Sequence, residues 1–160
     1  RNEQYLRDAL ERPYAEQTEL AVLFVDVDDF KAFNSSYGHA VGDQVLLFIT
    51  SLLARETGGA VGRIGGDEFL VIIEASEKIQ ALDGCLTQIE TIASHQFVHR
   101  GTGQCLPIFF CIGAVRIHFT DDGPMQLTVE ELVQLADTAM YQVKNSGTGG
   151  HLIIEYKSKS

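Results

Sequence analysis

The feature that most constrains the fold is a nearly continuous apolar run at residues 19–27 (ELAVLFVDV), which stops abruptly in acid. A run of this length is typical of a β-strand that is buried on both faces of a sheet. Three carboxylates mark its end, Asp26, Asp28 and Asp29. The run therefore predicts a buried strand, and its acidic end is a candidate ligand site, because open α/β architectures place such sites where a strand ends before a helix.

The rest of the chain alternates between helical periodicity and short strand-like runs. The order of these segments mixes βα crossovers with hairpins, which predicts an α+β fold with a central mixed, mainly antiparallel sheet flanked by helices. No repeat or linker interrupts the pattern, so residues 1–160 are expected to form a single domain. Helices are predicted at 2–11 (ended by Pro13), 30–37, 42–55, 76–93 and, from a capping box at Thr128 and Glu131, to about 145; strands are predicted at 60–64, 69–74, 97–99, 104–119 and 151–156.

Charge and composition narrow the classes of partner. The net charge of −10 argues against nucleic-acid binding, which relies on Lys and Arg facing phosphates. It does not exclude a nucleotide substrate, because Mg²⁺ can reverse the local sign of an acidic site. Cys85, Cys105 and Cys111 lack metal-binding spacing and are expected to be reduced thiols.

The sequence holds no apolar run long enough to span a membrane and no signal-peptide pattern. The sequence predicts helix from Arg1 onwards. We therefore expect a cytoplasmic fragment of a longer protein, in which any membrane anchor, sensor or regulatory domain lies outside this segment.

A glycine-rich turn is the second candidate site. Asp67 and Glu68 follow Gly65 and Gly66 between the strands predicted at 60–64 and 69–74, as a hairpin with a four-residue turn. Taken alone, this turn and Asp26 are better explained as local backbone features than as a site. If the hairpin lies beside the first strand, however, Asp26 and Asp67 converge on one cation, and two carboxylates with phosphate oxygens suit Mg²⁺.

Two further features suit a nucleotide. Gly65 and Gly66 have no side chains, so a bulky group such as a base or ribose can approach the turn closely. Lys31 can bind a polyphosphate. The backbone N–H groups of residues 28–30, which lie at a helix N-terminus, can also bind one. The residues by themselves thus predict a Mg²⁺-dependent phosphoryl or nucleotidyl transfer site.

A family resemblance extends this reading over essentially the whole chain. The motif elements follow in order: 26–34 (DVDDFKAFN), 37–39 (YGH), Gly42-Asp43, 63–69 (RIGGDEF), Ile112-Gly113, and 135–141 (LADTAMY) through Lys144 and Gly147. This combination strongly resembles the GGDEF family of diguanylate cyclases. The resemblance implies a fold like the palm of class III nucleotidyl cyclases. It also implies that two GTP condense to cyclic di-GMP, with release of two pyrophosphates, between two copies of the domain.

The resemblance also implies roles for individual residues. Asp26 and Asp67, with the backbone carbonyl of Val27, would hold Mg²⁺ (Mn²⁺ is possible). The candidates for accepting the proton are Glu68, Asp67 itself and solvent. An Asp accepts from the guanine N1–H and amine while an Asn donates and accepts, so such a pair favours GTP over ATP. The implied GTP-binding residues are Lys31 and Lys144 with the backbone of Asp29 and Phe30 at the phosphates, Asn34 and Asp43 at the guanine edge, and His39 and Gly66 nearby.

Three departures from the family pattern leave an alternative open. Thr148 stands where active members often carry Arg, which would remove one phosphate contact. The inhibitory RxxD motif is replaced by ETGG at 56–59, so product inhibition through that site is not expected. Ser35 replaces a common Asp, which we treat as minor. The alternatives are a catalytically weak GGDEF domain that binds GTP or serves as an interaction module, and, with a poorer match to Asn34 and Asp43, an adenylate or mixed-product cyclase.

Overall fold

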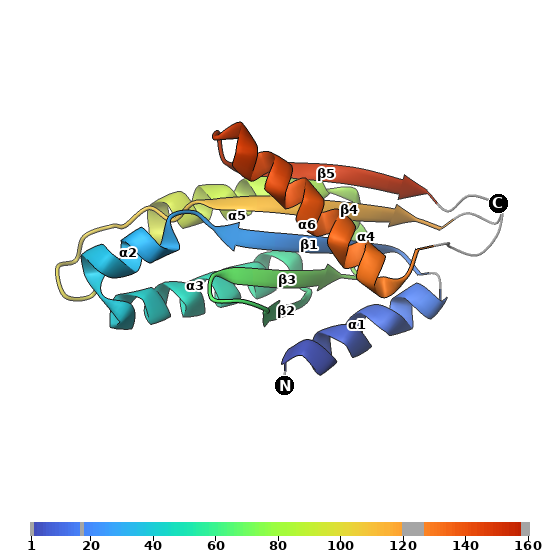
Figure 1. Ribbon diagram of the computed structural model, residues 1–160, viewed down its shortest axis with the longest axis horizontal. Coiled ribbons are helices and arrows are strands. Elements are labelled where there is room, and N and C mark those ends of the chain that lie inside the picture. Colours follow the sequence, from blue (N-terminus) through green and yellow to red (C-terminus); the bar gives the residue numbers. More distant parts are fainter. Residues whose placement is uncertain (1, 17, 120–126, 158–160) are drawn as a thin grey trace.

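The computed structural model describes residues 2–16, 18–119 and 127–157, and in them one five-stranded sheet carries helices on both faces (Figure 1). The strand order is β2-β3-β1-β4-β5, and only the β4–β5 pair is parallel in the described chain. The predicted α+β fold with a mixed, mainly antiparallel sheet is therefore confirmed. The elements are α1 (Asn2–Glu16), β1 (Leu20–Val27), α2 (Phe30–Tyr37), α3 (His39–Thr57), β2 (Ala60–Arg63), β3 (Glu68–Ile73), α4 (Ser76–Gln80), α5 (Leu82–Gln96), β4 (Phe110–His118), α6 (Val129–Ser146) and β5 (Gly150–Lys157).

The central strand β1 is buried along its whole length, as its apolar run predicts. Successive side chains point to opposite faces of a sheet. Leu23 and Val25 accordingly join the core beneath α3 and α5, whereas Val22 and Phe24 join the core beneath α1 and α6. Asp26 continues the second set, which directs its carboxylate towards α6.

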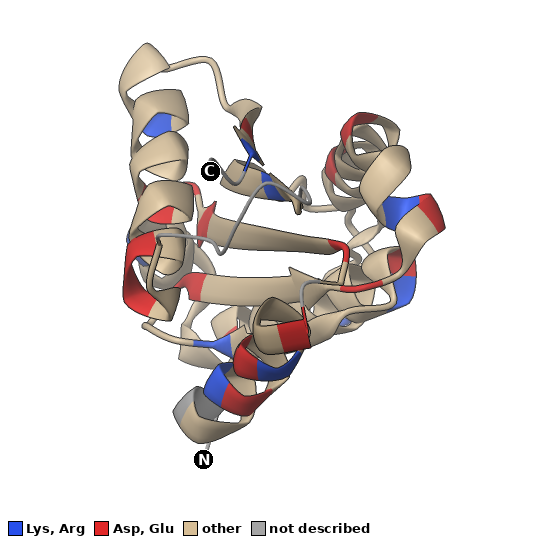
Figure 2. Ribbon diagram, turned by 90° about the vertical axis from the view of Figure 1, so that its right-hand side faces the viewer, with Lys and Arg blue, Asp and Glu red and all other residues tan. Residues whose placement is uncertain are grey.

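Acidic positions are spread over several helices and strand ends rather than gathered on one element, as Figure 2 shows in a view turned by 90°. None of the helices in the described ranges is both long enough and apolar enough to cross a membrane.

Helix α1 differs from its prediction, because it continues through Pro13 to Glu16 instead of ending. The carbonyl of Pro13 accepts from the N–H of Thr18 at 3.1 Å. The ring of Tyr14 packs edge-on against Phe119, with 6.2 Å between ring centroids. These contacts support the last turn, so tertiary packing outweighs the bond that proline removes.

The helix predicted at 76–93 is two helices, α4 and α5, which are divided at Ala81. Arg116 of β4 donates to the carbonyls of Ile79 (2.6 Å) and Gln80 (3.3 Å), at the end of α4. Arg116, which is distant in sequence, thus donates hydrogen bonds to backbone carbonyls at the point where the helix is interrupted. Helix α3, in turn, begins at His39 rather than at Gly42, directly after Gly38 (φ 90°).

Two predicted strands are also corrected. The segments at 97–99 and 104–119 share only the isolated bridge Val98–Cys105, and β4 begins at Phe110. Pro107 lacks an N–H group and interrupts the pairing. The turn of the β2–β3 hairpin comprises residues 64–67, one residue earlier than predicted, so Glu68 belongs to β3.

Candidate active site

Asp26 and Lys144 form an ion pair between β1 and α6. The Asp26 side chain is 6% exposed, and the Lys144 ammonium donates to its Oδ2 at 2.6 Å. Lys144 lies in the last turn of α6 and contacts the sheet because that helix lies unusually close to β4. A Cβ on Gly113 would lie 2.1 Å from the carbonyl oxygen of Ala136 and 2.2 Å from the backbone nitrogen of Met140. Glycine at position 113 therefore allows the approach that brings Lys144, one turn beyond Met140, to Asp26.

The β2–β3 hairpin brings two more carboxylates to the same place. Strand β3 runs antiparallel beside β1, and Glu68 pairs directly with Asp26 in the register. The N–H of Val27 donates to the carbonyl of Asp67 at 3.0 Å, which ties the turn to the end of β1. The structure thus has the hairpin beside the first strand, and it brings Asp26, Asp67 and Glu68 together.

The three carboxylates carry more negative charge than Lys144 balances. Burial raises the pKa of Asp67, and the nearby charge of Asp26 raises it further. The pKa of Glu68 is raised by burial and then by Asp26, with further contributions from Asp67 and from Asp137 of α6. The hydrogen bond to Asp26 raises the pKa of Lys144 and keeps it charged. Such a cluster favours an additional cation.

These residues fit Mg²⁺ that shares its coordination with a nucleotide. Among residues 2–16, 18–119 and 127–157, no three His, Cys, Asp or Glu side chains are arranged to hold a metal by themselves. Mg²⁺ commonly takes only one or two protein carboxylates and fills its remaining positions with water and phosphate oxygens. Asp26 and Asp67 supply such a pair, next to the backbone of Val27.

The loop between β1 and α2 is held by contacts that sequence reasoning missed. The N–H of Asp28 donates to the carbonyl of Phe109 at 2.9 Å, so the prediction that it faces a polyphosphate is wrong. The Cys111 thiol donates to Asp28 Oδ1 at 3.1 Å. Burial, and then this hydrogen bond, raises the pKa of Cys111 to about 12, which keeps it a thiol. Asp29 has a left-handed backbone (φ 53°, ψ 33°) at the start of α2, where helix N–H groups favour anions.

The predicted guanine-reading residues lie where α2 meets α3. The Oδ1 atom of Asn34 is buried and has no hydrogen-bond partner among the described residues. A Cβ on Gly42 would lie 1.8 Å from that atom, so the Asn34 amide rests against α3 beside Asp43. Asp43 is exposed, as are Lys31 and His39. The structure brings Asn34 close to the helix turn that carries Asp43, and it leaves Lys31 and His39 at the surface.

A cavity of about 680 Å³ opens beside the β1–α2 loop. Asp29 and Phe30 line one side, the turn at residues 147–150 lines another, and Glu90 of α5 contributes to the wall. Thr148 lies in this wall, and its hydroxyl is 2.9 Å from that of Ser146. At the hairpin, a Cβ on Gly66 would meet no atom of the described ranges within 4 Å, so the outer side of the turn is open there.

Two solved structures and one relative in sequence are similar to this chain. The GGDEF domain of TpbB (YfiN) from Pseudomonas aeruginosa has a TM-score of 0.76 at 28% identity and covers 96% of this chain and 92% of that one. The GGDEF domain of DgcB from Caulobacter crescentus, solved in complex with c-di-GMP, has a TM-score of 0.75 at 25% identity, covering 94% and 86%. Diguanylate cyclase DgcN from Escherichia coli is 35% identical over 131 residues, which are 78% of this chain and 29% of DgcN.

Other relatives are longer proteins with additional activities in their names. The bifunctional diguanylate cyclase/cyclic di-GMP phosphodiesterase MucR of Pseudomonas aeruginosa is 32% identical over 94% of this chain, which spans 21% of MucR. The cyclic di-GMP phosphodiesterase PdeR of Escherichia coli is 31% identical over 85% of this chain, which spans 20% of PdeR. The chain thus spans about a fifth of each.

The family model described as "Diguanylate cyclase, GGDEF domain" matches residues 1–150. With the fold of solved GGDEF domains around the Gly-Gly-Asp-Glu turn, the chain belongs to the GGDEF-domain family of diguanylate cyclases, which are nucleotidyltransferases.

Proposed function

We propose that this domain condenses two GTP molecules into cyclic di-GMP and releases two pyrophosphates. The observation that carries the proposal is the cluster of Asp26, Asp67 and Glu68 around the Lys144 ammonium at the end of β1. In each half-reaction a ribose 3′-hydroxyl attacks the α-phosphorus of the other GTP. One P–O bond forms there, and the P–O bond to pyrophosphate breaks.

Asp26 and Asp67 would hold Mg²⁺, or Mn²⁺ in its place, with the carbonyl of Val27. When bound, the ion lowers the pKa of the attacking hydroxyl and offsets phosphate charge. Glu68 is then the carboxylate left to accept the 3′-hydroxyl proton at a side-chain oxygen, with Asp67 as the alternative. The raised pKa of Glu68 supports this assignment, since a base is most effective when its pKa lies nearer the working pH.

The nucleotide would be held at both ends by the chain's own groups. Asn34 Oδ1 is buried against α3 with no hydrogen-bond partner among the described residues, so the amide would present its Nδ2–H group to the guanine edge, which it would share with Asp43. In the part of the chain that the structure describes, no atom lies within 4 Å of a Cβ placed on Gly66, which supports close approach of the nucleotide there. The remaining proposed contacts are Lys31 and Lys144 with the backbone of Asp29 and Phe30 at the phosphates, and His39 nearby.

A second copy of the domain completes the proposed reaction. One domain holds one GTP, so two domains related by a two-fold axis bring each 3′-hydroxyl to the opposite α-phosphorus. A regulatory or sensor domain in the longer protein would control that encounter. Because the substrate is GTP, we propose that the domain works in the cytoplasm.

The test is to fuse the full chain to a constitutive dimeriser and to incubate it with GTP and Mg²⁺. We expect cyclic di-GMP and two equivalents of pyrophosphate, detected by chromatography. Asp67→Asn is expected to abolish this turnover while the domain remains folded. If the fusion dimerises and binds GTP but makes no product, the proposal is wrong.

That last outcome would favour the second candidate, a catalytically weak domain that binds GTP or serves as an interaction module. Thr148 motivates this candidate, because its hydroxyl turns to Ser146 and it offers no positive charge to a phosphate. Measuring GTP binding beside turnover separates the two functions.

A further inference from the structure

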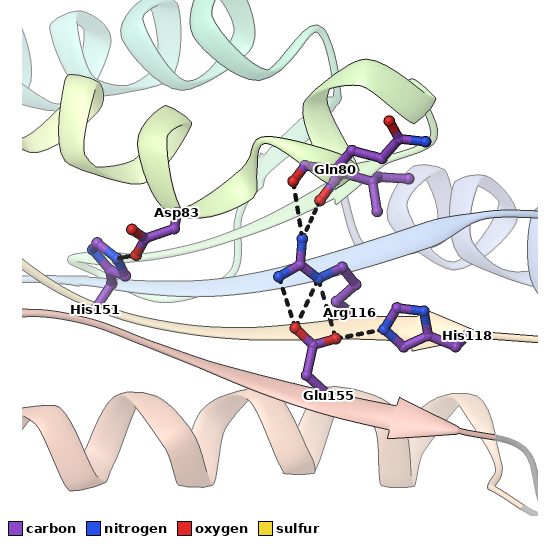
Figure 3. Close-up of polar contacts among 7 residues, drawn as sticks. Gln80, Asp83, Arg116, His118, His151 and Glu155 are labelled. Carbon is purple, nitrogen blue, oxygen red and sulfur yellow. Dashed lines mark hydrogen bonds and ion pairs between the residues drawn. The ribbon is translucent and has the colours of Figure 1, made fainter.

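His151, the second residue of β5, lies between two carboxylates of α5. Its Nε2 is 2.6 Å from Asp83 Oδ1, and its Nδ1 contacts Glu90 Oε1. Figure 3 shows the ring reaching from β5 to Asp83. Ionised carboxylates only accept hydrogen bonds, so both ring nitrogens must donate, which requires the imidazolium form. The His151 side chain is only 14% exposed, so this charge is held in a largely enclosed position.

This cluster borders the glycine-rich turn at residues 147–150, which joins α6 to β5. Glu90 lines the 680 Å³ cavity together with that turn. A Cβ on Gly150 would lie 3.6 Å from Glu90 Oε2, so the carboxylate that binds His151 also lies against the turn. Gly147, Gly149 and Gly150 all have positive φ. Because glycine has no side chain, the turn has few side-chain contacts of its own to hold it in place.

We propose that the protonated His151, held by Glu90 and Asp83, is a positioning residue that fixes the turn at residues 147–150 against the cavity and thereby sets the affinity for the phosphate groups of the nucleotide. The second half of this inference rests on the proposed function, which assigns phosphates to this side of the site. The first half concerns the turn alone and is measurable without any nucleotide.

We call the contacts of His151 with Asp83 and Glu90 the His151 clamp, and the surroundings of His151 determine how this clamp responds to pH. Asp83 and Glu90 face the ring from α5, and Asp28 faces Gly149 from the β1–α2 loop. Farther along the same side of the sheet, Arg116, His118 and Glu155 form a separate cluster, in which Arg116 Nη2 lies 2.7 Å from Glu155 Oε1 (Figure 3). The hydrogen bonds to Glu90 and then Asp83 raise the pKa of His151 to about 9. The contacts of the His151 imidazolium with Glu90 and Asp83 are therefore intact at neutral pH, and they are lost as the pH rises through 9.

The experiment compares His151→Gln with His118→Gln in the full chain. The control removes a histidine–carboxylate contact of 2.5 Å at the other end of the β4–β5 pair, away from the turn. The probes are a GTP analogue with an α,β-methylene bridge, which cannot be turned over, and guanosine, which has no phosphates. Calorimetry measures binding of each, and amide hydrogen exchange reports on Gly149 and Gly150.

We expect His151→Gln to weaken analogue binding about tenfold at pH 7.5, the effect of one lost charge-assisted hydrogen bond, and to speed exchange in the turn. Guanosine binding should not change, and His118→Gln should match the wild type. When the pH is raised from 7.5 to 10, the affinity of the wild type for the analogue should fall until it equals that of His151→Gln. The affinity of the variant over the same pH range is the reference.

Equal exchange and equal analogue affinity in the two variants would overturn the inference. If the wild type binds no GTP analogue, the proposed function fails instead, and turn exchange alone decides the clamp: faster exchange in His151→Gln than in His118→Gln supports it, and equal exchange overturns it.

Discussion

At the scale of single residues, the site places like charges where an ordinary sheet avoids them. Asp26 and Glu68 are direct partners across an antiparallel pair, and Asp67 lies at the adjoining turn. Opposed like charges destabilise strand pairing by roughly 0.2–1 kcal/mol. The arrangement therefore lowers the stability of the ligand-free domain. A role of these charges in binding a ligand accounts for that cost.

Glu68→Gln is accordingly expected to stabilise the domain and to impair its chemistry. Removing one charge relieves the repulsion, so the free energy of unfolding should rise by roughly 0.5 kcal/mol, as measured by urea denaturation. Cyclic di-GMP formation should fall by a factor of 10² or more, about the contribution of a general base. Glu19→Gln removes an exposed charge outside the site and is the matched control. Full activity in Glu68→Gln would rule out Glu68 as the proton acceptor.

Gly42→Ala tests whether the Asn34 amide reads the base. The new methyl group would lie 1.8 Å from Asn34 Oδ1, so the amide must turn away. We expect guanine nucleotide affinity to fall about tenfold, the loss of one good hydrogen bond. Gly84→Ala in α5 is the control, because its methyl group would meet none of the atoms that the structure describes within 4 Å. It should gain up to about 1 kcal/mol of helix stability and leave binding unchanged. Unaltered affinity in Gly42→Ala would contradict the role given to Asn34.

Thr148→Arg tests the departure from the family pattern. An Arg at this wall of the cavity supplies a bidentate donor for phosphate oxygens, so KM for GTP should fall severalfold with little change in kcat. Thr148→Gln adds a side chain without the charge and should not reproduce the effect. A KM that moves equally in both variants would show that charge at position 148 is irrelevant.

At the scale of elements, the contact of α6 with β4 depends on Gly113. In Gly113→Ala the methyl group would meet backbone atoms of α6 at 2.1 and 2.2 Å, so the helix must shift. We expect a loss of about 1–3 kcal/mol in the free energy of unfolding, typical of overpacking. The Lys144–Asp26 ion pair should weaken with it. In a double-mutant cycle, Lys144→Gln should therefore cost less in the Gly113→Ala background than in the wild type. Fully additive costs would mean that Gly113 does not position Lys144.

The elements that could be predicted are those whose signals are local. The apolar run of β1, the span of α2 and the capping box of Thr128 and Glu131 all match the structure, because periodicity and capping act within a few residues. The convergence of the carboxylates of β1 and the hairpin is also predictable, since each stands at a recognisable strand end or turn, while their roles towards a metal and a substrate stay predictions.

The remainder depends on contacts between distant segments. The break between α4 and α5 involves Arg116, which lies 36 and 37 residues from the carbonyls it binds. The role of Gly113 becomes visible only once α6 is placed, although a glycine in an apolar strand is itself a signal of close approach. The thiol–carboxylate contact of Cys111 with Asp28 and the clamp at His151 had no sequence signal, because each needs the strand order first.

At the scale of the whole molecule, stability should depend on pH through His151. Its pKa is about 9 when folded and 6.5 when unperturbed. A raised pKa stabilises the fold fully below 6.5, and the contribution is lost as the pH rises through 9. The wild type should therefore melt about 2–4 °C above His151→Gln at pH 6, corresponding to about 1 kcal/mol, and the difference should vanish by pH 10. A difference that is constant across this range would show that His151 does not titrate in the clamp.

The ion pair between Asp26 and Lys144 joins residues 118 positions apart in the chain. At roughly 10 residues per second, a ribosome takes on the order of ten seconds to pass from one codon to the other. The growing chain therefore contains Asp26, Asp67 and Glu68 well before Lys144 and the rest of α6 have been synthesised. A domain truncated before α6 would lack the Lys144 ammonium, so the complete charge cluster forms only in molecules whose translation has passed that helix.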